Sequence, residues 1–171
     1  MKGDQLALPS RLVIGAVAGF CATLAMTSAM ARMHRRLPEP ERYPLTPREI
    51  VDSATGGQLE DEPAKDVTIA AHFAYGAGCG ALIAAANPRI GVGSGALAGV
   101  GIWLASYMGW IPAARILKPA TDHPPRRNLL MIGAHLVWGA ALSASMRELS
   151  LARATMLRDG PDRDVATPAA T

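Results

Sequence analysis

Four long stretches without a charged residue dominate the pattern of hydrophobic and polar positions along this chain. Each is 19 to 25 residues long and lacks Asp, Glu, Lys and Arg; they are residues 12–31, 67–88, 90–114 and 128–146. About 20 apolar residues in an α-helix cross the ~30 Å hydrocarbon core of a bilayer. A water-exposed helix of this length would carry charges on its outer face every few residues. The pattern therefore predicts four transmembrane helices.

The linker between the first two stretches, residues 32–66, contains one helix start. The sequence Thr-Pro-Arg-Glu places Thr46 as an N-cap, Pro47 at the first helical position and Glu49 where it completes a capping box. We therefore expect a short surface helix at about residues 47–54.

Both ends of the chain are predicted to lie outside the helical domain. Residues 1–11 form a polar lead, and residues 148–171, rich in Ala, Asp, Arg and Pro, are expected to be a disordered tail. Lys2, an apolar run and Ala29-Met30-Ala31 follow the order of a signal peptide and its cleavage site. Because the run is longer than the usual core of about 7–15 residues, we interpret it as a helix of the mature protein.

Two pairs of matching segments indicate an internal repeat. Residues 71–77 and 134–140 both read Ala-His-x-x-aromatic-Gly-Ala, and residues 15–19 and 95–99 both read Gly-Ala-x-Ala-Gly. The order of the matches predicts a tandem duplication of a two-helix unit, with the copies related by a pseudo-twofold axis along the membrane normal. The expected fold is therefore an all-α, polytopic membrane four-helix bundle.

Small residues and one short turn predict how the helices pack. Asn87-Pro88-Arg89 is very short, so the second and third helices should be antiparallel neighbours. Lipid provides no hydrophobic drive between helices, so close backbone contact must hold them together. The glycines expected at such contacts are Gly15, Gly19, Gly76, Gly80, Gly91, Gly95, Gly99 and Gly139. We expect a tight bundle, with one glycine face available to a second copy or to another membrane protein.

The charge and the cysteine content indicate which kinds of partner and which cross-links to expect. The net charge is +3, but the basic residues flank the apolar stretches, where they would meet anionic headgroups of the bilayer. No zinc-finger spacing or basic helix appears, so nucleic-acid binding is not expected. Seven of the 17 basic residues lie with the termini and the 87–89 turn, leaving ten with the two long loops, which favours cytoplasmic long loops. Cys21 and Cys79 lie inside apolar stretches without a paired spacing, so no disulfide is implied.

Three segments of the chain resemble the YagU-like group of uncharacterised bacterial inner-membrane proteins: the linker RRLPEP…TPREI and the segments AHFAYGAGCGAL and AHLVWGAALSASM. The resemblance covers roughly residues 12–147. It implies a location in the bacterial plasma (inner) membrane, and no functional residue is carried over from it.

Two histidines are the candidate polar site inside the membrane. His72 and His135 lie about 7.5 Å and about 10 Å along helices that begin on the same side, so their depths should be similar. Ionisable groups at this depth usually face protein or a cavity. Tyr75 and Trp138, three residues further along, lie on nearly the same helix faces and complete the candidate site.

Three roles remain open for these residues. The histidines would hydrogen-bond to the backbone and lock the bundle, line a path for a proton or small solute, or ligate a haem iron or a divalent metal. No Asp, Glu or Cys stands at ligand spacing from either His, so neither a metal site nor a cofactor is expected. Trp103, Tyr107 and Trp110 form a stripe that we assign to bundle packing or the interfacial aromatic belt.

No catalytic signature accompanies these features: there is no triad, no HExxH and no Walker lysine, so no catalytic residue is named and an enzyme is not expected. The leading hypothesis is a small non-enzymatic accessory or stress-related membrane component that acts through helix packing. The alternative is a transporter or channel for a proton or small solute, and a haem- or metal-binding membrane protein comes third.

Overall fold

The computed structural model describes residues 6–160, and in this range it contains helices and no strand. The main elements in chain order are α1 (Leu8–His34), α2 (Thr46–Ala54), α3 (Asp61–Ala86), α4 (Val92–Leu104), the π-helix η2 (Ala105–Trp110), α5 (Ile111–Ala113) and α6 (Pro125–Ala154). Two short 3₁₀ turns, η1 (Glu39–Glu41) and η3 (Ala120–Asp122), lie in the long loops. The predicted all-α class is confirmed, and α2 lies over the predicted short helix.

Four helical segments are long and apolar enough to cross a membrane: Leu8–His34, Asp61–Ala86, Val92–Ala113 and Pro125–Ala154. They coincide with the four uncharged stretches and extend beyond several of their ends. Large apolar side chains cover the outer surface of these helices, among them Val13, Leu24, Ile69, Leu82, Leu97 and Leu129. An apolar outer surface of this extent suits a lipid environment.

Two predicted boundaries at the chain ends are wrong. Helix α6 continues to Ala154, so residues 148–154 of the predicted disordered tail are helical; Leu, Ala and Arg there are strong helix formers that extend an existing helix. Helix α1 begins at Leu8, inside the predicted polar lead, because Pro9 suits the first turn of a helix. Residues 161–171, the rest of the tail, lie outside the described range.

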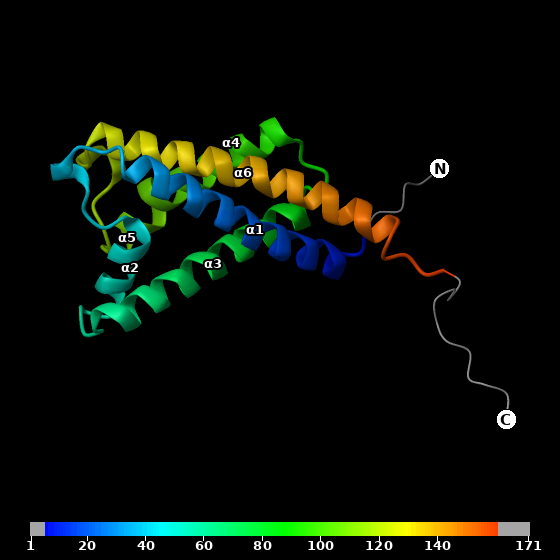
Figure 1. The fold of residues 1–171 in the computed structure, drawn as a ribbon, viewed down its shortest axis with the longest axis horizontal. Helices are drawn as coiled ribbons and strands as arrows, with labels where there is room; N and C mark the ends of the chain where they lie inside the picture. The colour runs from blue at the N-terminus through cyan, green and yellow to red at the C-terminus, as the bar shows by residue number, and fades with distance from the viewer. Residues whose placement is uncertain (1–5, 161–171) are drawn as a thin grey trace, which may run out of the picture.

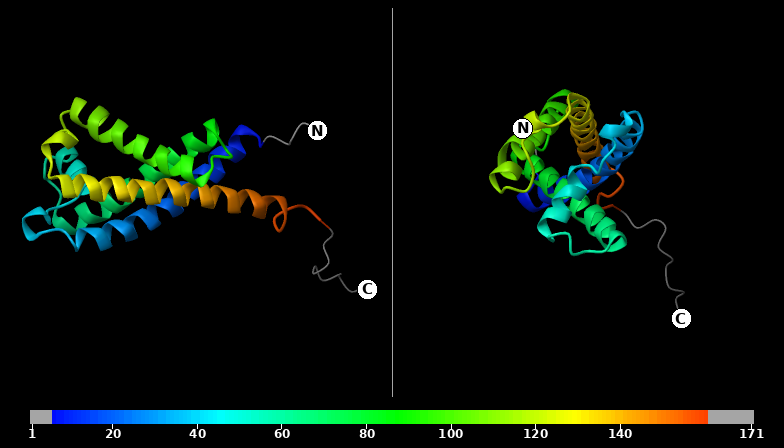
Figure 2. Two further views of the ribbon diagram at one scale, coloured as in Figure 1. Left: turned by 90° about the horizontal axis from the view of Figure 1, so that it is seen from above. Right: turned by 90° about the vertical axis from the view of Figure 1, so that its left-hand side faces the viewer.

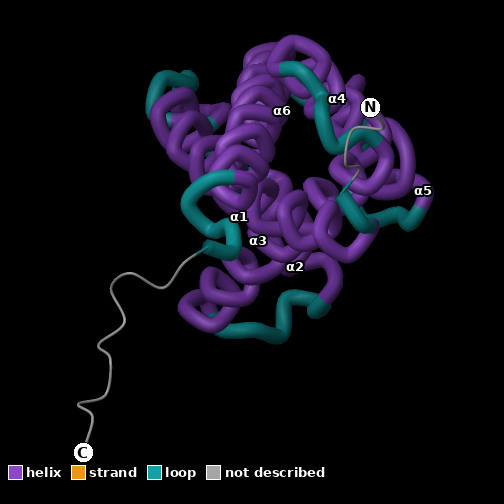
Figure 3. Tube along the Cα trace, turned by 90° about the vertical axis from the view of Figure 1, so that its right-hand side faces the viewer, coloured by secondary structure: helices purple, strands orange, loops and turns teal. Residues whose placement is uncertain are grey.

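The helices pack in the spatial order α3, α1, α6, α4. Helix α1 packs along both α3 and α6, and α4 packs along α6. Viewed along the bundle, α4 and α6 lie together on one side and α1 and α3 on the other (Figure 3). The short turn after α3 makes α3 and α4 antiparallel, but they diverge from that turn instead of packing on each other (Figures 1 and 2). The predicted antiparallel arrangement of α3 and α4 therefore agrees with the structure, whereas the prediction that they are packed neighbours is wrong.

Glycines set the closest contact between α1 and α3. A Cβ at Gly19 would collide with the carbonyl oxygen of Gly76, and one at Gly15 would collide with that of Gly80. A side chain at Gly15, Gly19 or Gly80 would push the two backbones apart, and one at Gly76 would collide with the Thr23 hydroxyl. These are the contacts that small residues provide inside a membrane.

Helices α4 and α6 meet in the same way. A Cβ at Gly95 would collide with the Gly139 carbonyl and the Ser143 hydroxyl, and one at Gly99 with the His135 carbonyl. These contacts occur at positions equivalent to those of the α1–α3 pair, which agrees with the predicted repeat; the duplication itself stays a prediction. Gly91 has open space around it, so its predicted role in packing is wrong: it is the N-cap of α4 and precedes the contact.

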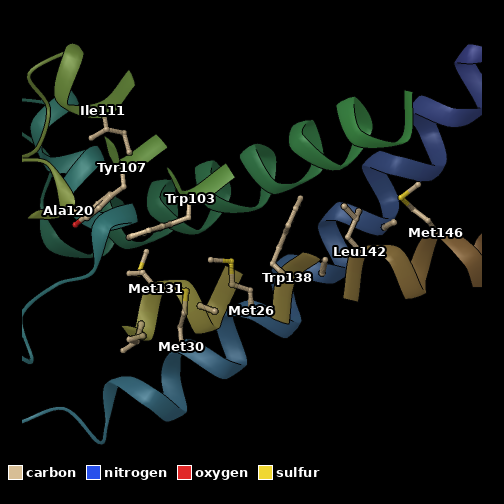
Figure 4. Packing of buried hydrophobic residues seen from close by; sticks show 14 of the residues in the cluster. Met26, Met30, Trp103, Tyr107, Ile111, Ala120, Met131, Trp138, Leu142 and Met146 are labelled. Atoms are coloured by element: carbon tan, nitrogen blue, oxygen red, sulfur yellow. The ribbon is translucent and has the colours of Figure 1, made fainter. Parts of the chain in front are cut away.

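The core lies between α1 and α6. Ala18, Ala22 and Ala134 are fully buried, since small side chains allow the two helices to approach closely. Towards the loops the contact is filled by flexible methionines, with Met26 and Met30 of α1 near Met131 of α6, and Figure 4 shows Trp138 and Leu142 continuing this core along α6. Beyond the glycine contacts, large side chains therefore hold the helices further apart.

Candidate intramembrane ligand site

A cavity of about 230 Å³ lies where α3 and α4 diverge. Residues of α1, α2, α3, α4, η2, α5 and α6 line it, and most of them are apolar or aromatic. The polar side chains in its wall are Thr23, Thr46, His72, Tyr75, Ser106, Tyr107 and His135. The two helix pairs touch at their glycines and separate around bulky residues one or two turns further on. The cavity is the consequence of that change in side-chain size.

All four residues of the predicted polar site, His72, Tyr75, His135 and Trp138, line this one cavity. Sequence reasoning grouped them through the repeat, and the structure brings them together although α3 and α6 are not packed on each other. Their surroundings differ in one respect that matters for function: some of their polar atoms already have partners and others have none.

His135 is held by its own helix. Its Nδ1 lies 2.7 Å from the carbonyl oxygen of Met131, one turn earlier. A carbonyl only accepts, so Nδ1 carries the proton and donates it. In the neutral ring the Nε2 atom is then an acceptor with a free lone pair. Because this bond lies within α6, it orients the His135 ring and does not itself join two helices, so a role of His135 in locking the bundle stays a prediction.

His72 and Trp103 have buried nitrogen atoms without a partner. The Nε2 atom of His72 and the Nε1 atom of Trp103 are both inaccessible, and neither has a hydrogen-bond partner among the described residues. Trp103 is only 7% exposed. A buried polar group left without a partner costs about 1–3 kcal/mol. Both residues line the cavity, so a small side-chain rotation would bring either nitrogen to a molecule inside it.

Trp138 and Tyr75, by contrast, make hydrogen bonds between helices. Trp138 donates its Nε1 proton to Thr23 Oγ1 at 3.1 Å, which joins α6 to α1. The hydroxyl of Tyr75 lies 2.8 Å from Ser106 Oγ, which joins α3 to η2 across the divergence. The Tyr75 ring lies 6.4 Å from that of Trp110, and both are almost half exposed. These two aromatic residues form the wall between the cavity and the surrounding lipid.

The π-helix η2 places three residues on the cavity wall. Its backbone is wider than an α-helix and ends near Gly109, whose φ of −111° and ψ of −105° are not helical. The extra residue per turn directs Ser106, Tyr107 and Trp110 towards the cavity. Single π-turns inside longer helices occur often at functional sites. Sequence analysis found the Trp103, Tyr107 and Trp110 stripe and assigned it to bundle packing or the interfacial aromatic belt, because no sequence signal marks a π-turn.

Helix α2 covers the loop end of the cavity. Its Pro47, Ile50 and Val51 side chains line the cavity, and Thr46 donates its hydroxyl proton to the Tyr107 hydroxyl oxygen at 3.2 Å. Thr46 was predicted to cap α2, and this is wrong: Leu45 is the N-cap residue, and no side chain caps the helix. The Thr46 hydroxyl, which the capping motif would have used, instead forms a hydrogen bond with the buried Tyr107.

Arg127, a residue that sequence analysis took for an ordinary membrane-flanking charge, attaches this cover to the bundle. Its side chain is 3% exposed and donates to the carbonyl oxygens of Glu41, Tyr43 and Pro44 at 3.2, 3.0 and 2.9 Å. The guanidinium also lies over the Tyr43 ring, 3.5 Å from its centre. A planar group with five donors suits several carbonyls at once. Arg127 therefore fixes the linker, and with it α2, to the start of α6.

Glu49 lies beside this anchor. One of its carboxylate oxygens is 4.0 Å from an Arg127 nitrogen, too long for a hydrogen bond, and is buried without a partner. Burial raises the pKa of the Glu49 carboxyl, and the positive charge of Arg127 reduces that rise. The loop end of the cavity thus contains a charged cluster that the cavity wall itself lacks.

Among residues 6–160, no group of three or more His, Cys, Asp or Glu side chains is arranged to hold a metal ion. Comparison with known proteins found no matching family model, no similar curated protein and no similar solved structure. The functional argument therefore depends on the geometry of the site.

Proposed function

We propose that this chain is a non-enzymatic integral membrane protein that binds a small lipophilic molecule in the cavity between α3 and α4. The observation that carries the proposal is a mostly apolar cavity between the candidate membrane helices, lined by two residues whose buried nitrogens have no hydrogen-bond partner among the described residues. Binding sites for small molecules are concave, mostly apolar and provided with a few polar groups that orient the ligand.

The position of the cavity supports entry from the bilayer. Its lateral wall consists of Tyr75 and Trp110, which are partly exposed on the lipid-facing side, and the hydrogen bond between the Tyr75 and Ser106 hydroxyls joins the helices there. Helix α2 covers the loop end, and the glycine contacts lie at the other end. A binding site that opens sideways agrees better with this arrangement than a pore between the two membrane faces.

A matched pair of substitutions on α3 tests the proposal. Ala71 lines the cavity, whereas Ala74, three residues later, is exposed and does not line it. Ala71→Phe should fill part of the cavity, and Ala74→Phe should add the same side chain to the lipid-facing surface. Both positions are exposed, so we expect both variants to fold.

The readout is the chain's own fluorescence, since all three tryptophans, Trp103, Trp110 and Trp138, line the cavity. In lipid nanodiscs, 1-bromonaphthalene should quench wild type and Ala74→Phe saturably, and Ala71→Phe should require about tenfold more of it. Equal, non-saturable quenching of all three proteins would contradict the proposal. The accessory or stress-related role, the possible oligomer, the inner-membrane location and the cytoplasmic long loops stay predictions.

A further inference from the structure

Building on the proposed function, we infer that the ligand is a neutral ring with oxygen atoms at opposite ends, the chemistry of a lipid-soluble quinone or its quinol. The inference comes from the two unpartnered nitrogens, from the helices that carry them and from the composition of the cavity wall. Each of these restricts a different property of the ligand.

The first restriction concerns hydrogen bonding. The indole nitrogen of Trp103 can only donate, so its partner must offer an acceptor oxygen. The Nε2 atom of His72 donates in one neutral tautomer and accepts in the other. When His72 donates, each nitrogen is satisfied by its own carbonyl oxygen, and when His72 accepts, a hydroxyl group satisfies it. The pair therefore suits both a ring carbonyl and the corresponding ring hydroxyl.

The second restriction concerns the positions of these oxygens. His72 is on α3 and Trp103 is on α4, the two helices that diverge around the cavity. His72 lies three residues before Tyr75, and Trp103 lies three residues before Ser106, the hydrogen-bond partner of Tyr75. The two helices are antiparallel. The two residues are therefore displaced in opposite directions from that bond, about 9 Å apart along the bundle at 1.5 Å per residue. One oxygen at each end of a six-membered ring suits donors on opposite walls.

The third restriction concerns charge and shape. No Asp, Glu, Lys or Arg side chain lines the cavity, so a charged ligand would lose its hydration without gaining a counter-ion. Five aromatic side chains do line it, and Trp103 and Tyr107 are stacked at 6.2 Å with an angle of 25° between their planes. Flat rings pack well against such surfaces. Figure 4 shows Trp103 and Tyr107 facing the side of the core that holds Met26 and Met131. Methionine sulfur in general packs favourably against aromatic rings, so these two residues also suit a flat ring ligand.

The experiment compares two probes that share a ring skeleton, 1,4-naphthoquinone and naphthalene, by equilibrium dialysis against the full chain in lipid nanodiscs. Wild type should bind the quinone at least about tenfold more tightly than the hydrocarbon, since two hydrogen bonds contribute. Trp103→Phe and His72→Phe should each weaken quinone binding about fivefold more than they weaken naphthalene binding. Retained naphthalene binding shows that a variant's cavity is intact.

Two further variants make the test specific. Thr27→Val removes a hydroxyl of α1 that donates to the Thr23 carbonyl and does not line the cavity, so quinone binding should not change. His72→Gln keeps a donor near the same place and should recover part of the quinone affinity. Equal binding of naphthalene and the quinone, or equal loss of quinone binding in Trp103→Phe and Thr27→Val, would overturn the inference about ligand chemistry and leave the binding cavity standing. Saturable binding of neither probe would overturn both proposals.

Discussion

Replacement of Arg127 by Met should release the linker that carries α2 while the membrane helices stay folded. The buried guanidinium donates to three linker carbonyls, at 2.9 to 3.2 Å. Hydrogen bonds that involve a charged group contribute about 1.5–3 kcal/mol each, and they are not additive because one side chain makes all three. Removing one partner of a buried charged interaction typically costs about 3–5 kcal/mol. We take about 3 kcal/mol as the expected loss.

That energy should appear as local opening, because the linker carbonyls regain water once the linker detaches from α6. A change of about 3 kcal/mol corresponds to about two orders of magnitude in the opening equilibrium. Amide hydrogen exchange in nanodiscs should therefore accelerate about 100-fold in peptides that cover residues 37–49. Arg127→Lys should show a smaller but clear acceleration, since a single ammonium cannot satisfy three carbonyls with the geometry of a planar guanidinium.

The adjacent Arg126 provides the matched control. It precedes Arg127 in the same helix turn but is exposed, so Arg126→Met should leave exchange in the linker unchanged. Exchange in residues 37–49 that rises less than about tenfold in Arg127→Met, or that rises equally in Arg126→Met, would refute the assignment of Arg127 as the anchor.

Three further predictions concern packing and pH. Gly99→Leu should destabilise the α4–α6 pair by about 1–3 kcal/mol or more, measured by thermal denaturation in detergent. Gly101 has open space around it, so Gly101→Leu should leave stability unchanged. Equal destabilisation by both substitutions would contradict the contact at Gly99. Trp138→Phe should lower stability by about 0.6 kcal/mol through loss of its hydrogen bond to α1, and no loss at all would count against that bond's contribution. Because the folded-state pKa of Glu49 is raised, its contribution to stability is present below its unfolded pKa and is lost as pH rises through the folded value. The melting temperature of wild type relative to Glu49→Gln should therefore fall from about pH 4 to about pH 8, and parallel profiles would show that Glu49 is not buried.

Much of the site follows from short-range patterns in the sequence. The uncharged stretches predicted which segments form long apolar helices, and the repeated Ala-His-x-x-aromatic-Gly-Ala segment identified four residues that line one cavity. Small residues at four-residue spacing predicted most of the close helix contacts, since they require only a face without side chains. All of these are properties of one helix at a time, and one helix is what a local pattern describes.

The arrangement between helices was decided only by the tertiary structure. The separation of α3 from α4 depends on bulky residues spread over several elements, and the π-turn that turns Ser106 towards Tyr75 has no sequence signature. The burial of Arg127 depends on how the linker between α1 and α3 folds back, and that linker lies some 80 residues earlier in the chain. Whether a polar atom such as His72 Nε2 has a partner is likewise a property of the assembled bundle, because its neighbours come from helices far apart in the sequence.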